Sequence, residues 1–184
     1  MTTEIRSIEL FVRDVQQRLG LPTLFAGGAV RDLLHGKEPK DFDLFLMDGE
    51  DFQMYEEVAD RIRAVADDGV ITDYQKYMNG SESLHSVIHF EVQGWPFDFI
   101  VLDAVVYTPE DVVKMFDLNL NQIWLDGDGH YAFLDYLNYP TQTDLVQLTD
   151  SPDTPSIDRI EALMARYPQY DWDGVFIGLG IDYV

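Results

Sequence analysis

Apolar residues change repeatedly between helical and strand spacing along this chain of 184 residues, and this alternation constrains its fold more than any other feature. Apolar residues three or four positions apart predict helices, whereas alternating polar and apolar residues and short apolar runs predict strands. By these criteria the expected helices are 8–19, 29–35, 52–66, 109–114 and 156–167, and the expected strands are 22–26, 41–46, 70–74, 86–92, 96–102, 122–125 and 131–134. Helices interspersed with hairpins predict an α+β domain with a mixed sheet and flanking helices.

The chain is long enough for one domain with a substantial core, and its 46% content of hydrophobic residues argues against disorder over most of its length. No apolar run approaches the roughly 18 residues that a membrane span needs, and the charged N-terminal segment does not resemble a secretory signal. The absence of cysteine excludes a disulfide framework and a thiolate metal site, and it suits a cytoplasmic protein. We expect one domain over residues 1–140 and a short C-terminal appendage over residues 141–184.

The charge of the chain is unusual, because 34 acidic residues against 12 basic ones give a formal net charge of −22. Such a chain repels the phosphate backbone of nucleic acids, whereas most nucleic-acid-binding proteins present a basic surface. Any polynucleotide substrate must therefore meet a local basic patch or a separate partner. The acidity is equally consistent with a surface adapted only for solubility.

Asp41 and Asp43 lie two residues apart in an expected strand. Side chains two apart in a strand point to the same face, so both carboxylates lie on one side while Phe42 and Leu44 face the core. Adjacent carboxylates repel each other unless a cation lies between them, and hard oxygen ligands favour Mg²⁺ or Mn²⁺. On its own, an Asp-x-Asp pair is more often a solvated strand face than a metal site.

Asp98 interrupts the otherwise apolar strand 96–102, which a turn at 93–95 joins to strand 86–92. A buried strand rarely contains a lone carboxylate without a partner or a metal, although an edge strand can turn such a residue toward water. Three carboxylates can hold two divalent ions, of which one activates an attacking hydroxyl and the other stabilises a triphosphate and its leaving group.

Gly27 and Gly28 lie between an expected strand and the start of a helix. Glycines at such a position let the backbone approach a ligand closely, and the free N–H groups at the helix start favour phosphate. The alternative is a plain tight turn. Arg31 and Asp32, one turn into the helix, either orient a triphosphate or pair with each other within the scaffold.

Together these residues resemble the DNA polymerase beta superfamily of nucleotidyltransferases, and within it the head domain of bacterial CCA-adding enzymes and poly(A) polymerases. The signature of that family is Gly-Gly-x-Val-Arg-Asp-x-Leu-x-Gly followed by a short loop and Asp-x-Asp. It is matched here by Gly27, Gly28, Val30, Arg31, Asp32, Leu34, Gly36, Asp41 and Asp43. The resemblance covers roughly residues 20–137 and implies a polymerase-beta-like domain in which Asp41, Asp43 and Asp98 are the catalytic, metal-binding residues and Mg²⁺ or Mn²⁺ is the cofactor.

A second segment, residues 117–122, resembles the family's Asp-Phe-Thr-Ile-Asn-Ala segment, which contacts the nucleotide. The resemblance therefore implies a nucleotide site made of Gly27, Gly28, Arg31, Asp32, Lys40, Asp117 and Asn121. The chain departs from the family where Met115 and Phe116 replace two arginines. It also lacks most of the helical neck, body and tail, of which only the helix 156–167 could be a neck remnant.

The expected function is transfer of a nucleoside monophosphate from a nucleoside triphosphate to a hydroxyl acceptor, most simply an RNA 3′ end that binds weakly or through a partner. Two alternatives stay open: a protein or small-molecule acceptor, and a non-catalytic nucleotide-binding or assembly module that kept the fold. The intact carboxylates argue for an enzyme, and the missing arginines argue for the non-catalytic module. The sequence does not indicate the acceptor, the preferred base, the bacterial or phage source, or the oligomeric state.

Three further features have structural interpretations. His85 and His89 lie four apart on an expected strand, and we expect them at the strand surface rather than in a metal site. The loop 126–130 has acidic residues like a calcium loop, but Tyr131 stands where an EF-hand needs glycine, so we expect a turn. The aromatic C-terminal residues could stack on bases, but we expect them to pack against the domain.

Overall fold

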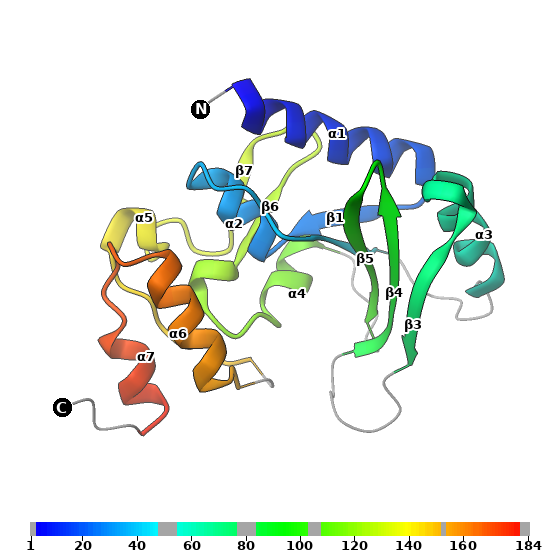
Figure 1. Ribbon diagram of the computed structural model, residues 1–184. Coiled ribbons are helices and arrows are strands. Elements are labelled where there is room, and N and C mark those ends of the chain that lie inside the picture. The colour runs from blue at the N-terminus through cyan, green and yellow to red at the C-terminus, as the bar shows by residue number, and fades with distance from the viewer. Residues whose placement is uncertain (1–2, 48–54, 77–83, 103–107, 152–153, 181–184) are drawn as a thin grey trace.

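A computed structural model describes residues 3–47, 55–76, 84–102, 108–151 and 154–180, and it contains a mixed sheet of seven strands flanked by helices (Figure 1). The strand order is β3-β4-β5-β2-β1-β6-β7. The strands are β1 (Thr23–Ala26), β2 (Phe42–Leu46), β3 (Ile71–Lys76), β4 (Leu84–Val92), β5 (Trp95–Leu102), β6 (Ile123–Leu125) and β7 (Tyr131–Phe133). The α+β fold class predicted from the sequence is confirmed.

The helices follow the predicted stripes, with two short additions near the C-terminus. They are α1 (Thr3–Leu19), α2 (Gly28–Leu34), α3 (Tyr55–Val65), α4 (Pro109–Val113), α5 (Pro140–Thr143), α6 (Ile157–Arg166) and α7 (Asp173–Gly178), with short 3-10 helices η2 (Asp67–Gly69) and η3 (Asn119–Asn121). The start of the third predicted helix, residues 52–54, lies outside the described residues. No helix in the described ranges is both long and apolar enough to span a membrane.

One parallel pair gives the sheet its mixed character. β2 pairs with β5 in parallel, whereas every other neighbouring pair of described strands is antiparallel. The parallel register sets Asp43 directly opposite Asp98. The two carboxylates predicted from separate strands are therefore cross-strand neighbours.

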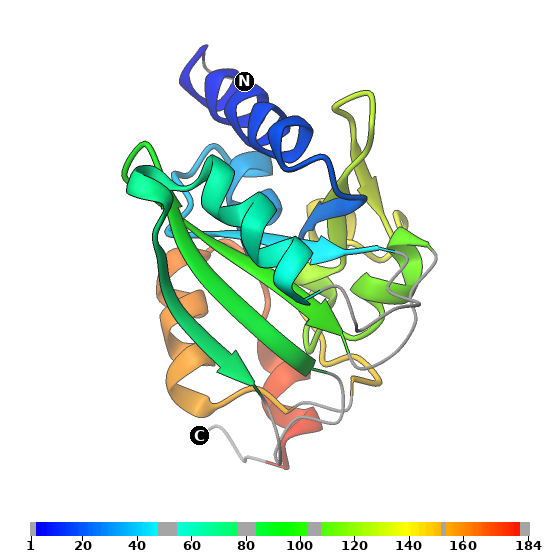
Figure 2. The same cartoon turned by 90° about the vertical axis from the view of Figure 1, so that its right-hand side faces the viewer.

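Alternation along β2 divides its side chains between two apolar clusters. Phe42 and Leu44 are fully buried in the larger cluster, which includes residues of α1 and α3 on the same face of the sheet (Figure 2). Phe45 faces the opposite side and joins a smaller cluster with Val112 and Val113 at α4. The half-buried Asp43 has the same orientation as Phe45, so it lies on the face with the smaller cluster.

The C-terminal elements share the larger cluster. Ile160 of α6 and Val175 of α7 are fully buried in it, as is Tyr167 between them. Trp172 and Phe176 are also buried, so the predicted packing of the aromatic C-terminal residues is confirmed for these positions. The division of the chain near residue 140 stays a prediction.

Candidate functional site

The fold brings the three predicted metal carboxylates to one face of the sheet. Asp41 is exposed just before β2, while Asp43 and Asp98 are half-buried on β2 and β5. Burial and the nearby charges of Asp41 and Asp98 raise the pKa of Asp43 to about 7. Although the residue is exposed, neighbouring groups partly shield its carboxyl from water, and this desolvation, followed by the charge of Asp98, raises the pKa of Asp41. A divalent cation relieves such repulsion, and carboxylate oxygens are the ligands that Mg²⁺ and Mn²⁺ prefer, so the donor set fits the predicted ions.

The three carboxylates are more widely spread than a compact metal cluster. Within the described ranges, Asp126, Asp128 and His130 form the sole set of three such residues whose ligand atoms all lie within 4.8 Å of one another. Asp41, Asp43 and Asp98 do not meet this criterion. Carboxylates that serve two ions do not have to converge on one point, so this spread is compatible with a two-metal site.

The compact cluster at 126–130 is a hairpin turn between β6 and β7. The Oδ1 atom of Asp126 accepts hydrogen bonds from the backbone N–H groups of Asp128 and His130, at 2.9 and 2.8 Å. The side chains of Asp128 and His130 are exposed. The prediction of a turn at this loop is confirmed.

The Gly27–Gly28 turn connects β1 to α2. Gly27 has φ = +84°, a backbone conformation that side chains disfavour, and its N–H donates to the carbonyl of Ile123 at 2.9 Å. A Cβ atom on Gly27 would lie 3.3 Å from the ring of Phe116, and one on Gly28 would lie 3.6 Å from Arg31 Nη2. Side chains of the protein itself thus lie against both glycines, as in the tight-turn alternative, and the phosphate role stays a prediction.

Arg31 and Asp32 form a buried ion pair, with exposed fractions of 7% and 4%. Asp32 Oδ1 accepts from Arg31 Nε and Nη2 at 2.9 and 2.6 Å and also from the hydroxyl of Tyr167. Arg31 Nη1 donates to Asn121 Oδ1 at 2.7 Å. These bonds correspond to the scaffold alternative, and a contact of either residue with nucleotide stays a prediction.

Two arginines of α6 extend this network to the other predicted nucleotide residues. Arg166 Nη2 donates to Asp32 Oδ2 at 2.6 Å, and Arg159 Nη2 donates to Asp117 Oδ1 at 3.3 Å. Asp117 also accepts from Asn121 Nδ2 at 3.1 Å. Arg166 Nε is buried and has no hydrogen-bond partner in the described part of the chain. Helix α6 therefore supplies positive charge where the sequence predicted nucleotide contacts.

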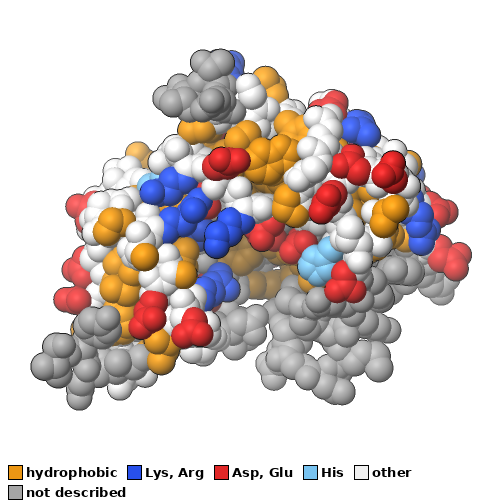
Figure 3. All heavy atoms as spheres, viewed as in Figure 1, with side chains coloured by type: hydrophobic (Ala, Val, Ile, Leu, Met, Phe, Trp, Pro, Cys, Tyr) orange, Lys and Arg blue, Asp and Glu red, His pale blue; other side chains and the backbone are white. Residues whose placement is uncertain are grey.

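A small cavity of about 130 Å³ joins the two parts of the predicted site. Its lining comes from the Gly-Gly turn, the loop before β2 and α6, and consists of Gly28, Ala29, Arg31, Asp32, Lys40, Asp41, Ala162, Leu163 and Arg166. Figure 3 shows Lys and Arg side chains gathered beside acidic side chains on this side of the molecule. Ligand pockets for drug-sized molecules are ~300–1,000 Å³, so this cavity can hold a phosphate group but not a whole nucleotide.

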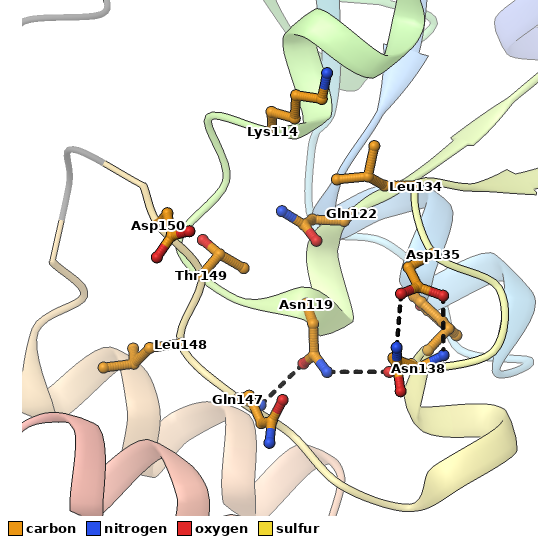
Figure 4. A pocket seen from close by; sticks show the side chains of 11 residues that line it. Lys114, Asn119, Gln122, Leu134, Asp135, Asn138, Gln147, Leu148, Thr149 and Asp150 are labelled. Atoms are coloured by element: carbon orange, nitrogen blue, oxygen red, sulfur yellow. Dashed lines mark hydrogen bonds between the residues drawn. The ribbon is translucent and has the colours of Figure 1, made fainter.

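A second cavity, of about 870 Å³, has Asn119 of η3 in its lining and contains none of the predicted site residues (Figure 4). Asn119 fixes its wall: Oδ1 accepts from the N–H of Gln147 at 3.0 Å, and Nδ2 donates to the carbonyl of Asn138 at 3.2 Å. The full lining is Lys114, Asn119, Gln122, Leu134, Asp135, Asn138, Tyr139, Gln147, Leu148, Thr149 and Asp150. Cavity size alone therefore does not identify the carboxylate site.

Comparison with protein families shows to which family the chain belongs. A model of the Gabija anti-defense 2 (Gad2) family matches residues 5–139, which is most of the chain. The chain belongs to the Gabija anti-defense 2 family. The matched span contains every predicted site residue from Gly27 to Asn121, whereas Arg159 and Arg166 lie beyond it. No curated protein sequence matches the chain.

Solved structures confirm that this Gad2-family chain has the nucleotidyltransferase fold. A CCA-adding enzyme in complex with CTP aligns with a TM-score of 0.51 and 13% identity over 80% of this chain and 34% of that enzyme. A tRNA-processing enzyme in its apo form I aligns with a TM-score of 0.50 and 18% identity over 80% of this chain and 37% of that enzyme. The chain thus spans about a third of the length of these structures, and identities this low show the fold alone.

Sequence reasoning missed one neighbour of the carboxylates in this Gad2-family chain. The side chain of His89 is bonded to Asp98, with 2.5 Å between Nδ1 and Oδ1. A three-residue turn at 93–95 was predicted, but Val92 pairs with Trp95, so the turn contains only Gln93 and Gly94. The two-residue turn sets the register in which His89 is opposite Asp98. Prediction of this shorter turn from the sequence would have indicated the contact.

Proposed function

We propose that the chain transfers a nucleoside monophosphate from a nucleoside triphosphate to a hydroxyl acceptor. The observation that carries this proposal is the placement of Asp41, Asp43 and Asp98 on one face of a nucleotidyltransferase fold. Burial and the nearby charges of Asp41 and Asp98 raise the pKa of Asp43 to about 7, which supports a site for a positively charged ligand over a solvated strand face.

In the proposed reaction, the acceptor hydroxyl oxygen attacks the α-phosphorus, and the bond from that phosphorus to the bridging oxygen of the β-phosphate breaks. Pyrophosphate leaves, and the hydroxyl proton passes to solvent. Asp41, Asp43 and Asp98 would hold Mg²⁺ or Mn²⁺, which when bound lowers the pKa of the hydroxyl and stabilises the leaving group. The absence of cysteine and the need for a nucleoside triphosphate suit a reaction in the cytoplasm.

We assign two roles to the predicted nucleotide residues. Gly28 and Lys40 line the small cavity beside Asp41, and there they would contact phosphate. The buried Arg31–Asp32 pair, together with Asp117 and Asn121, would hold the surrounding backbone in place. Gly27 provides the turn that brings the start of α2 to this cavity.

The solved neighbours, a CCA-adding enzyme in complex with CTP and a tRNA-processing enzyme, support an RNA 3′ end as the acceptor. Two observations limit how such an RNA can bind: the net charge of −22, and the engagement of Arg31, Arg159 and Arg166 by carboxylates of the protein itself. We therefore propose a short acceptor, or one delivered by a basic partner.

A second candidate is a protein target, which is either nucleotidylated or bound without catalysis. The match to a family named for anti-defense activity favours it, and so does an acidic surface that suits a basic protein better than RNA. The same fold and carboxylates would serve either acceptor.

Incubation of the purified chain with each labelled nucleoside triphosphate, Mn²⁺, and either tRNA lacking its 3′ end or cell lysate tests these proposals. Label on RNA supports the first acceptor, and label on a protein band supports the second. An Asp43→Asn variant is the control for contaminating activity. The absence of label from every acceptor in the presence of wild-type protein would contradict the enzymatic proposal and favour binding alone.

A further inference from the structure

Four polar side chains form a row across the sheet at the candidate site. By register, Asp73 of β3 is opposite His89 of β4, His89 is opposite Asp98 of β5, and Asp98 is opposite Asp43 of β2. Side chains in directly opposed positions share one face of a sheet. His89 is therefore the one basic residue within a row of carboxylates, and it is next to a proposed metal ligand.

The bond between His89 and Asp98 restricts the carboxylate. Nδ1 of His89 donates to Oδ1 of Asp98 at 2.5 Å, because an ionised carboxylate can only accept. Both side chains are partly shielded from water, with exposed fractions of 29% and 26%. This bond engages Oδ1 and leaves Oδ2 of Asp98 as the oxygen proposed to bind the ion.

The repulsion within the site explains why Asp98 needs such a partner. Desolvation first, and then the charges of neighbouring carboxylates that include Asp98, raise the pKa values of Asp41 and Asp43, so the three carboxylates repel one another. A side chain free to rotate would turn its carboxylate away from the other two. A donor on the neighbouring strand holds one oxygen in place and thereby leaves the other in a fixed direction.

We propose that His89 is a positioning residue, which orients the carboxylate of Asp98 for the divalent ion through the Nδ1–Oδ1 hydrogen bond. This inference rests on the proposed function, since it assumes that Asp98 is a metal ligand. Partners that hold a metal ligand in place typically contribute ~10–100-fold to metal affinity. We expect a loss of this size when the donor at His89 is removed.

Three variants separate this role from the alternatives. In His89→Asn the amide nitrogen can occupy the position of Nδ1 and donate to Asp98, whereas His89→Leu has no donor and His89→Gln places its amide one carbon farther from the backbone. Glu91→Gln is the matched control, because Glu91 is two residues along the same strand, on the same face, and pairs with Pro96 rather than with a carboxylate. His89→Gln remains informative if the leucine variant does not fold.

The measurement is Mn²⁺ binding to the full chain without nucleotide, by electron paramagnetic resonance, with Asp43→Asn defining the weak binding that any acidic protein shows. We expect roughly 10–100-fold weaker binding in His89→Leu and His89→Gln, and binding near that of the wild type in His89→Asn and Glu91→Gln. Wild-type affinity in His89→Leu or His89→Gln would overturn the inference. Equal loss in His89→Asn and His89→Leu would also overturn it, because the imidazole would then be a direct ligand.

The experiment distinguishes failure of the proposed function from failure of the role assigned to His89. If Asp43→Asn binds Mn²⁺ as tightly as the wild type, the metal site and the inference both fall. If Asp43→Asn abolishes site-specific binding and the His89 variants do not weaken it, the proposed function stands and the role of His89 is wrong. In nucleotide transfer, the positioning role predicts that His89→Leu raises the Mn²⁺ concentration for half-maximal rate, while the rate at saturating Mn²⁺ changes less.

Discussion

The stretch from Gly27 to Asp43 has two parts, and the charged side chains of these parts have opposite environments in the fold. In the paired part, residues 27–32, the charges of Arg31 and Asp32 are buried and satisfied by each other and by side chains of α6 and its C-terminal flank. In the carboxylate part, Asp41 and Asp43 lie beside Asp98, and in the described chain neither of them has an ion pair. Residues that resemble a single motif thus divide into a buried pair, whose charges the protein itself satisfies, and a cluster of like charges, for which we propose a metal ligand.

This contrast makes separate predictions for activity and for stability. Substitution in the carboxylate part removes a proposed metal ligand and relieves repulsion, so it should affect reaction rate without harming the fold. Substitution in the paired part leaves a buried charge without its partner, so it should affect the fold first. The two kinds of measurement can therefore test whether the division is correct.

The largest expected effect is on catalysis. Asp43→Asn should slow nucleotide transfer by roughly 10²–10⁴-fold, because loss of a metal ligand removes several kcal/mol of transition-state stabilisation. The midpoint of thermal unfolding should be unchanged or higher, since an uncharged amide is not repelled by Asp41 and Asp98. Asp128→Asn, in the exposed turn at 126–130, should leave the rate unchanged. Loss of activity in Asp128→Asn but not in Asp43→Asn would move the metal site to that turn.

The next effect is on stability. Asp32→Ala should lower the free energy of unfolding by about 3–5 kcal/mol, because it leaves the buried guanidinium of Arg31 without its carboxylate partner. Asp60→Ala is the matched control: Asp60 pairs with Arg63 at 2.8 Å, but its side chain is 75% exposed, and pairs of this kind contribute about 0–1 kcal/mol. Urea unfolding measures both. Similar losses in the free energy of unfolding would show that the Arg31–Asp32 pair contributes no more than an exposed ion pair.

A smaller effect separates the two glycines. Gly27→Ala should destabilise the protein by about 1–3 kcal/mol, because a side chain is strained at φ = +84° and its Cβ would lie 3.3 Å from the Phe116 ring. Gly28→Ala should cost less, since its Cβ would lie in ordinary contact 3.6 Å from Arg31 Nη2. Thermal unfolding of both variants tests this order, and a larger loss in Gly28→Ala would contradict it.

Calorimetric titration of Gly28→Val with ATP adds a test of binding. We expect ATP to bind the wild type only with Mg²⁺ or Mn²⁺ and to bind Gly28→Val more weakly, because the valine side chain would intrude on the cavity that Gly28 lines. Unchanged binding by this variant would argue against a phosphate contact at Gly28.

The parts of this division that could be predicted from sequence are those that depend on local spacing. Period-two alternation placed Asp41 and Asp43 on the face opposite Phe42, and strand patterns gave the elements on which Asp43 and Asp98 lie. The parallel pairing of β2 with β5 was not predicted, because it is set by the whole sheet rather than by either strand. The sequence predicted a three-residue turn at 93–95, whereas the structure has a two-residue turn at Gln93 and Gly94. Because this difference changes the strand register, the pairing of His89 with Asp98 was not predicted.

The pairing of Asp32 with α6, and of Arg31 with Tyr167 just after that helix, could not be predicted, because it joins residues far apart in the chain. Arg166 donates to Asp32 across 134 positions, and Arg159 donates to Asp117 across 42. The sequence offered phosphate binding and internal pairing as alternatives for Arg31, and only the tertiary packing of α6 shows which partners lie within reach. A motif thus predicts which residues are near one another but not which charges the fold itself satisfies.

The smallest effect is a difference in pH response between the carboxylate part and His35, whose side chain is hydrogen-bonded to Arg31 of the paired part. In metal-free protein, the pKa of Asp43 is raised to about 7, so its contribution to stability is full below the unfolded pKa of 3.8 and is lost as pH rises through 7. His35, whose Nδ1 donates to the carbonyl of Arg31 at 2.7 Å, has the opposite sign. Burial lowers its pKa from 6.5, so its contribution is present above pH 6.5 and is lost as the pH falls through the lowered value.

Thermal unfolding between pH 4 and 8 in the presence of a chelator, compared among wild type, Asp43→Asn and His35→Gln, separates the two contributions. Relative to wild type, Asp43→Asn should gain stability above pH 7, where the unfavourable ionisation of Asp43 has been removed. His35→Gln should lose less stability than wild type on acidification below pH 6.5, because no imidazole has to accept a proton against burial. Addition of Mn²⁺ should reduce the difference in thermal stability between wild type and Asp43→Asn at pH 8, because the proposed ion would stabilise only the carboxylate part. The difference in thermal stability between wild type and His35→Gln should stay unchanged. A change of equal size in both differences would mean that the two parts are not independent.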